Sequence, residues 1–128
     1  MSKEIKSKTK LQQKQLAFLE ETVKFYNTNN RCVEGSKCFY YLDGKDGCAI
    51  GRHIKNKTLC RSFDKYSLTS VITDSIFYSL PKKLQYLTQM FLDAIQKLHD
   101  NKQNWNKGGL SERGKGEVKI IKTEFSLN

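Results

Sequence analysis

The segment 98–116 concentrates the side chains that are best suited to hold a ligand. It contains three asparagines, three lysines, one arginine and the only tryptophan of the chain, next to His99 and Asp100. A loop that only reverses the chain direction needs little more than Gly, Asn, Asp or Ser. Amide, cationic and aromatic groups together can bind a planar, phosphorylated compound through hydrogen bonds, charge and stacking. We therefore expect a small-molecule site in this part of the chain.

Catalysis is only weakly indicated. His99 and Asp100 are adjacent, and adjacent residues of a helix point in different directions, so they do not form an obvious acid–base pair. No local signature marks a cysteine–histidine nucleophile pair. The segment Gly44–Gly47 lacks the Gly-Lys-Ser/Thr ending of a phosphate-binding loop. We expect a protein without catalytic residues, and we keep a small hydrolase as an alternative.

The four cysteines do not follow the spacing of a structural zinc site. Cys32, Cys38, Cys48 and Cys60 are separated by five, nine and eleven residues, so no Cys-x-x-Cys pair is present. We expect buried free thiols, no metal site and no cofactor. Reduced thiols agree with the cytoplasmic location that we expect, because the sequence has no signal-like apolar region near residue 1 and no apolar run of about 20 residues.

The net charge of the chain favours an anionic partner. Twenty-three Lys and Arg against 13 Asp and Glu give a formal charge of +10, which attracts nucleic acids and small phosphorylated ligands. The same excess of Lys, beside many Asn, is also typical of compositional bias, so charge alone identifies no partner. The sequence has no RNA-recognition motif and no zinc-finger spacing. Direct binding to a host protein or to nucleic acid stays an alternative function.

Apolar residues recur with helical spacing in two long segments. One is 11–26, which the asparagine-rich segment 27–30 should end. The other is 81–100, with Ser79 as its expected N-cap and Pro81 in its first turn. Between residues 55 and 79 the apolar positions have no clean period, and short helices and irregular structure fit equally well.

A third helix is expected after the polar segment, with Ser111 as its N-cap. Val118 and Ile121 would face the core. Gly114 and Gly116 each weaken such a helix by up to ~1 kcal/mol. A strand over 118–121 therefore stays an alternative.

A β-hairpin is expected between the first two long helices. Cys38–Leu42 is rich in aromatic residues, Asp43–Gly47 has turn composition, and Cys48–Ile54 would return as the second strand. Arg52 would then lie on an apolar strand face, where it needs either a carboxylate or a ligand phosphate as partner.

These elements predict an α+β fold in which an antiparallel, hairpin-based sheet packs with the N-terminal helix and a long helix near 81–100. Residues 1–10 are expected to form a basic flexible tail, and 11–128 a single ligand-binding domain. The apolar content of 38% is below the usual value of about 45–50%. Part of the apolar surface is therefore expected to be buried against another copy, in a dimer or higher homo-oligomer.

Two stretches together resemble a known family. They are Asp43–Arg52, with the pattern Asp-Gly-Lys…Cys-Ala-Ile-Gly-Arg, and Leu98–Glu112, with Leu-His-Asp…Trp…Gly-Leu-Ser. With the intervening Leu-Pro-x-x-Leu…Leu-x-x-Phe-Leu pattern, the sequence is similar to the type 1 Thoeris anti-defence proteins of phages over about residues 15–125. The resemblance implies a sponge in an infected bacterial cell. Such a protein binds a cyclic ADP-ribose isomer made by a host TIR-domain enzyme, at a subunit interface, without cleaving it.

The resemblance also implies a set of pocket residues. Phe91 and Asn101 fit an aromatic–amide pair ten residues apart, and Arg52 fits a phosphate-binding arginine. The match is poorer around Arg113, because lysine stands at positions 119 and 122 where the family pattern implies arginine. The expected ligand-binding residues are Arg52, Phe91, Asn101, Asn104, Trp105, Arg113, Lys119 and Lys122. In this set Phe91 or Trp105 would stack on the purine, Asn101 or Asn104 would bind its edge, and Arg52 and Arg113 would bind phosphate. The alternative role of Phe91 and Trp105 is packing in the core. The alternative role of His99 is that of a hydrogen-bonded structural histidine, whose cationic form the helix C-terminus would favour.

Overall fold

The computed structural model describes residues 8–34, 37–41, 47–66 and 72–128, and helices dominate these ranges. The α-helices are α1 (Lys10–Phe25), α2 (Lys57–Tyr66), α3 (Asp74–Ser79), α4 (Lys82–Gln85), α5 (Gln89–Asp100) and α6 (Glu112–Glu124), with single 3₁₀ turns η1 (Gly51–His53) and η2 (Lys102–Asn104). Two short antiparallel ladders pair β1 (Val33–Glu34) with β2 (Lys37–Cys38) and β3 (Trp105–Asn106) with β4 (Gly109–Leu110). The α+β fold class is confirmed.

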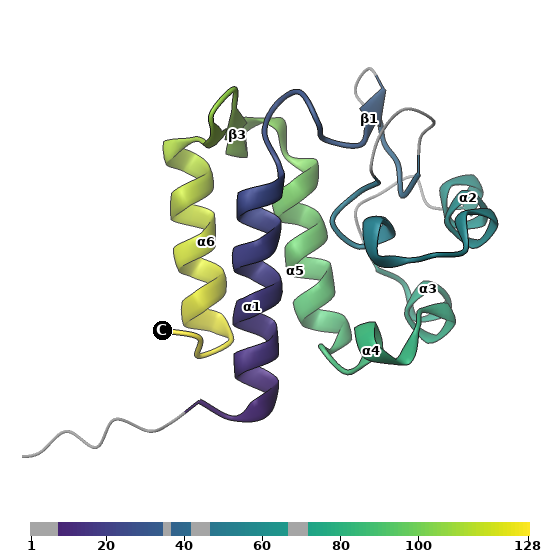
Figure 1. The fold of residues 1–128 in the computed structure, drawn as a ribbon, viewed down its shortest axis with the longest axis horizontal. Helices are drawn as coiled ribbons and strands as arrows, with labels where there is room; N and C mark the ends of the chain where they lie inside the picture. The colour runs from purple at the N-terminus through teal and green to yellow at the C-terminus, as the bar shows by residue number, and fades with distance from the viewer. Residues whose placement is uncertain (1–7, 35–36, 42–46, 67–71) are drawn as a thin grey trace, which may run out of the picture.

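The helices α1, α5 and α6 pack side by side with their axes aligned (Figure 1). Helix α6 is antiparallel to α5, and the β3–β4 hairpin joins their adjacent ends. The Phe91 ring of α5 lies 6.3 Å from the Phe18 ring of α1 and 5.3 Å from the Phe125 ring just after α6. The core of this three-helix layer is therefore formed by residues from both ends of the chain.

The predicted N-terminal helix is confirmed to within one residue at each end. Thr9 caps it by accepting a hydrogen bond from the Gln12 amide, and the Gln12 side chain accepts one from the Thr9 amide. Asn30 closes the other end by donating to the Phe25 carbonyl. Residues 1–7 of the expected tail lie outside the described residues, whereas Thr9, which was assigned to that tail, belongs to the helix cap.

The predicted long helix over 81–100 is present but interrupted, as α4 and α5. Thr88 separates them with φ 81°, a left-handed conformation that is unusual for a β-branched residue. Its hydroxyl then caps α5 by accepting from the Phe91 amide. Ser79 is not the N-cap of this region. It is the last residue of α3, and its hydroxyl donates to the Ser75 carbonyl.

The predicted hairpin is wrong in its details. Among the described residues of 31–54, ladder pairing is confined to β1 and β2, and Gly51–His53 is a 3₁₀ turn instead of a strand. The amides of Tyr40 and Tyr41 donate to the Asp64 carboxylate at 2.6 and 3.2 Å, so a side chain of α2 takes the place of a strand partner. Residues 42–46 of the predicted turn lie outside the described residues.

The last predicted helix is confirmed as α6. The Ser111 hydroxyl accepts from the Gly114 amide, as expected for an N-cap. Helix over 118–121 excludes the strand alternative. No helix in the described ranges is long and apolar enough to cross a membrane.

Candidate functional site

A groove with a volume of about 460 Å³ lies between the antiparallel helices α5 and α6. Helix α5 contributes Met90, Asp93, Ala94, Lys97 and Leu98, and α6 contributes Arg113, Glu117, Ile120, Ile121 and Glu124. Asn101 and Asn104 also line it, from the connection between α5 and β3. A volume of this size is typical of small-molecule sites.

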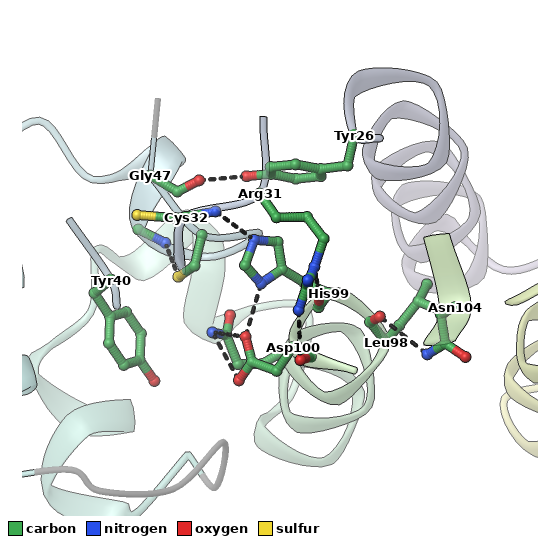
Figure 2. A network of polar contacts seen from close by, with 12 residues as sticks. Tyr26, Arg31, Cys32, Tyr40, Gly47, Leu98, His99, Asp100 and Asn104 are labelled. Atoms are coloured by element: carbon green, nitrogen blue, oxygen red, sulfur yellow. Dashed lines mark hydrogen bonds and ion pairs between the residues drawn. The ribbon is translucent and has the colours of Figure 1, made fainter. Parts of the chain in front are cut away.

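Side chains donate hydrogen bonds to the last carbonyls of α5, and Figure 2 shows those at Leu98 and His99. The Leu98 carbonyl accepts from Asn104 Nδ2 at 3.1 Å and from Trp105 Nε1 at 3.0 Å. The His99 carbonyl accepts from Arg31 Nε at 2.7 Å. A helix end leaves such carbonyls without intrahelical partners. Three side chains supply the missing donors here: Asn104 and Trp105 hold η2 against α5, and Arg31 holds the segment before β1 against it.

The side-chain oxygens of the two asparagines at this end differ in their hydrogen bonding. Asn101 is half-buried, and its Oδ1 accepts from the Gln103 amide at 2.9 Å. Asn104 is only 2% exposed, and its Oδ1 has no hydrogen-bond partner although its Nδ2 is bonded. A buried acceptor without a partner costs ~1–3 kcal/mol. Asn104 therefore offers an unused acceptor next to the groove.

Arg113 reaches the same end of the groove from the first turn of α6. It is exposed, and among the described residues neither it nor the groove carboxylates of Glu117 and Glu124 form an ion pair. The third groove carboxylate, Asp93, pairs with Lys97 at 2.8 Å. A free guanidinium therefore lies at the end of the groove where the two amides lie.

Gly114 allows this close approach of α6 to η2. A Cβ atom at position 114 would lie 2.2 Å from the backbone oxygen of Asn104 and 2.8 Å from Leu110 Cδ2. The same carbonyl of Asn104 accepts from the Ser111 amide at 2.9 Å. Glycine at 114 thus sets the distance between Arg113 and Asn104.

The groove is not where the excess positive charge of the chain collects. Two cations, Lys97 and Arg113, face three carboxylates, whereas the whole chain carries +10. A ligand with a single anionic region suits this lining better than an extended polyanion. Within one copy, Arg113 is the group that best matches a phosphate, because its planar guanidinium binds two oxygens at once.

The structure places both predicted stacking residues in the core. Phe91 is 0% exposed and packs edge-on against its phenylalanine neighbours. Trp105 is buried as well, and its indole nitrogen is bound to the end of α5. Neither ring presents a face to the groove lining. The core alternative is therefore favoured for both residues.

Arg52 does not line the groove. Of its two expected partners, a carboxylate or a ligand phosphate, the structure has the carboxylate. Its guanidinium pairs with Glu21 and stacks over the Phe25 ring at 4.0 Å. Burial, the largest single cause, would lower the pKa of Arg52, but the hydrogen bond that Arg52 donates to Glu21 and the charges of Tyr26 and Glu21 together raise the pKa. The partner is thus a side chain of α1.

Lys119 and Lys122 are also separate from the groove. Lys119 is exposed and lines a shallower hollow of about 350 Å³ with Ile120, Thr123 and Glu124. Lys122 is half-buried and lines neither hollow. Of the eight predicted ligand residues, the groove brings together Asn101, Asn104 and Arg113.

His99 is a structural residue inside a buried polar network (Figure 2). Its Nε2 accepts from the Cys32 amide at 3.2 Å, which leaves Nδ1 to donate to Asp100 Oδ1 at 2.7 Å. Burial lowers the pKa of His99 despite the neighbouring carboxylate. The expected hydrogen-bonded role is therefore correct, but the ring is neutral rather than cationic.

The carboxylates and the apolar rim of the groove were not among the predicted site residues. Met90 is 70% exposed and Ile120 is 58% exposed, and both line the groove. A signal was present in α6, since Arg113, Glu117, Ile120 and Glu124 recur every three or four residues and thus share one helix face.

The thiols agree with the structural role expected for them. Cys32, Cys48 and Cys60 are buried, Cys48 and Cys60 are free thiols, and burial raises the pKa of both. The side chain of Cys38 lies outside the described part of the structure. Within that part, no group of three or more His, Cys, Asp or Glu side chains is arranged to hold a metal ion.

Comparisons with protein-family models, with curated proteins and with solved structures found no match for this chain.

Proposed function

We propose that this protein is a phage anti-defence sponge that binds a cyclic ADP-ribose-type nucleotide signal and sequesters it unchanged, in the cytoplasm of an infected bacterium. One observation carries the proposal. Asn101 and Asn104, from the connection between α5 and β3, and Arg113, from α6, line one end of a groove of about 460 Å³. Amides and a free guanidinium are the groups that bind a purine edge and a phosphate. The resemblance of the sequence to Thoeris anti-defence proteins supports the same ligand class.

The remaining groove residues fit the rest of such a ligand. Leu98 and Ile121 supply apolar surface for a ring face. Glu117 and Glu124, which are free of ion pairs among the described residues, can accept hydrogen bonds from ribose hydroxyls. The groove therefore combines groups for the base, the sugar and one phosphate region.

A second copy of the chain completes the pocket in this proposal. Met90 and Ile120 expose apolar side chains at the groove, and exposed apolar surface beside a polar site is typical of an interface. Arg113 and Lys97, the latter paired with Asp93, are the cations of one copy. A partner would cover the apolar rim and add positive charge opposite a pyrophosphate.

Sequestration requires release of the intact ligand, and this can be measured directly. The protein is incubated with a panel of cyclic ADP-ribose isomers, the free ligand is removed, and the complex is heat-denatured before chromatography. A sponge returns the isomer that it bound unchanged. Fragments would identify a hydrolase, and failure to retain any isomer would favour an inhibitor that acts on a protein or nucleic acid. Either of these outcomes contradicts the proposal.

Point variants test the groove itself. Asn101→Ala and Arg113→Ala should each weaken binding at least tenfold. Arg113→Ala removes a hydrogen bond to a charged phosphate, which contributes about 1.5–3 kcal/mol, and Asn101→Ala leaves a polar group of the purine edge without its partner, which costs about 1–3 kcal/mol. Arg61→Ala is the matched control, since Arg61 is an exposed arginine of α2 outside the groove. Isothermal titration calorimetry of the three variants measures the effect. Equal affinity of all three would place the ligand elsewhere.

A further inference from the structure

The orientation of the Asn104 side-chain amide is fixed by its neighbour. Its amide lies 3.1 Å from the Leu98 carbonyl oxygen, which can only accept hydrogen bonds. The nitrogen of the amide must therefore face Leu98, and the oxygen must point the other way, as Figure 2 shows. Trp105 Nε1 donates to the same carbonyl at 3.0 Å, so no rearrangement of the amide alone improves the pairing.

In this orientation the Asn104 side chain can only accept a hydrogen bond from a ligand through Oδ1, because its Nδ2 already donates to Leu98. Its Oδ1 is buried and has no hydrogen-bond partner. Asn104 lines the groove at the end that Asn101 and Arg113 also line. A ligand edge that carries an N–H group can satisfy the oxygen, whereas an edge that carries a carbonyl would set two acceptors against each other.

From this asymmetry we infer that Asn104 makes the groove specific for a ligand that presents an exocyclic amino group, as adenine does, and makes it reject the hypoxanthine counterpart. The inference rests on the proposed function, because it concerns the base of the same nucleotide ligand. A ribose hydroxyl is the other donor that such a ligand carries. Free carboxylates at Glu117 and Glu124 provide stronger acceptors for hydroxyls farther along the groove.

The test compares ligands and needs no variant. Each cyclic ADP-ribose isomer is titrated beside the compound of identical linkage in which the amino group is replaced by oxygen. The adenine compound should bind at least tenfold more tightly, equivalent to about 1.4 kcal/mol. Equal affinity of the two compounds would overturn the inference and leave the proposed function intact. If no compound binds, the proposed function fails, and the inference fails with it.

Asn104→Ala shows whether Asn104 is responsible for the preference. The ratio of the two affinities should fall toward one in this variant, because the Asn104 oxygen that distinguishes the two compounds is removed. Asn106→Ala is the control, since Asn106 is an exposed asparagine two residues away that does not line the groove. A preference that persists in Asn104→Ala would overturn the assignment. Since the ratio compares ligands on one protein, a general loss of stability does not change it.

Discussion

Two glycines of α6 that look equivalent in sequence should respond in opposite ways to substitution by alanine. Ordinarily alanine stabilises a helix over glycine by up to ~1 kcal/mol. At Gly116 a Cβ atom would meet nothing within 4 Å, so that gain should be realised. At Gly114 the same atom would lie 2.2 Å from the Asn104 carbonyl oxygen and 3.0 Å from its carbon.

The cost at position 114 follows from what the new atom meets. The contact is with backbone, which cannot rotate away as a flexible side chain could, so η2 or the start of α6 must move. Overpacking of this kind costs about 1–3 kcal/mol, and we take the upper end for a backbone contact. After the helical gain of up to ~1 kcal/mol, Gly114→Ala should be destabilised by about 2 kcal/mol. The two variants should therefore differ by about 3 kcal/mol.

Thermal and urea unfolding, followed by circular dichroism and by the fluorescence of Trp105, measure this difference. For a chain of 128 residues, 1 kcal/mol corresponds to a shift in Tm of about 4 °C. We expect Tm to fall by about 8 °C in Gly114→Ala and to rise by up to about 4 °C in Gly116→Ala. A Gly114→Ala protein as stable as the wild type would show that α6 does not approach η2 as described, and the geometry of the groove end would be wrong.

Two further predictions concern regions outside the groove. Arg52→Ala should lower stability by about 1–2 kcal/mol, because it removes the ion pair with Glu21 and the stacking on Phe25. The same variant should leave the affinity for a cyclic nucleotide unchanged. A loss of affinity in calorimetry without a loss of Tm would show that Arg52 belongs to the ligand site. Lowering the pH from about 7.5 to about 5.5 should decrease the free energy of unfolding. Burial holds the pKa of His99 and His53 below 6.5 in the folded protein. As the pH falls, these histidines therefore bind protons in the unfolded chain before they do so in the folded protein. The stability that the folded protein has above pH 6.5 is then lost. Urea unfolding at the two pH values measures this, and constant or increasing stability at the lower pH would contradict a neutral His99.

Local signals predicted those elements whose ends are specified by neighbouring residues. The ends of α1 and the start of α6 are fixed by side chains within five residues of the cap, at Thr9, Asn30 and Ser111. Such contacts can be seen in the sequence because no distant partner is needed. The same reasoning failed at Ser79, where the hydroxyl bonds backward within α3.

Distant partners explain the elements that could not be predicted. The apolar stripe over 81–100 continues through Thr88, so its periodicity cannot reveal the break. The Leu87 carbonyl at that break accepts a hydrogen bond from Gln15 of α1. The segment Phe39–Tyr41 has strand composition, yet the amides of Tyr40 and Tyr41 donate to the carboxylate of Asp64 in α2. In both cases a side chain remote in sequence takes over a backbone group that local propensity would pair differently.

The candidate site was predictable in the identity of its polar groups and not in their exposure. Asn101, Asn104 and Arg113 were selected by residue type, and the groove brings these three together. Phe91 and Trp105 were selected for the same reason, but burial depends on which helices cover them. Arg52 needed a partner in either interpretation, and only the position of Glu21 decides between a carboxylate and a phosphate.

The order of synthesis has a consequence for α1. Gln15 meets its hydrogen-bond partner Leu87 across 72 residues, and the rings of Tyr26 and Trp105 lie 6.0 Å apart although they belong to opposite halves of the chain. At about 5–20 residues per second, a ribosome needs roughly 4–14 s to translate those 72 residues. During that time the part of the helix that packs against α5 and α6 has no partner. Newly made chains of this protein should therefore be clients of chaperones until α5 and α6 emerge.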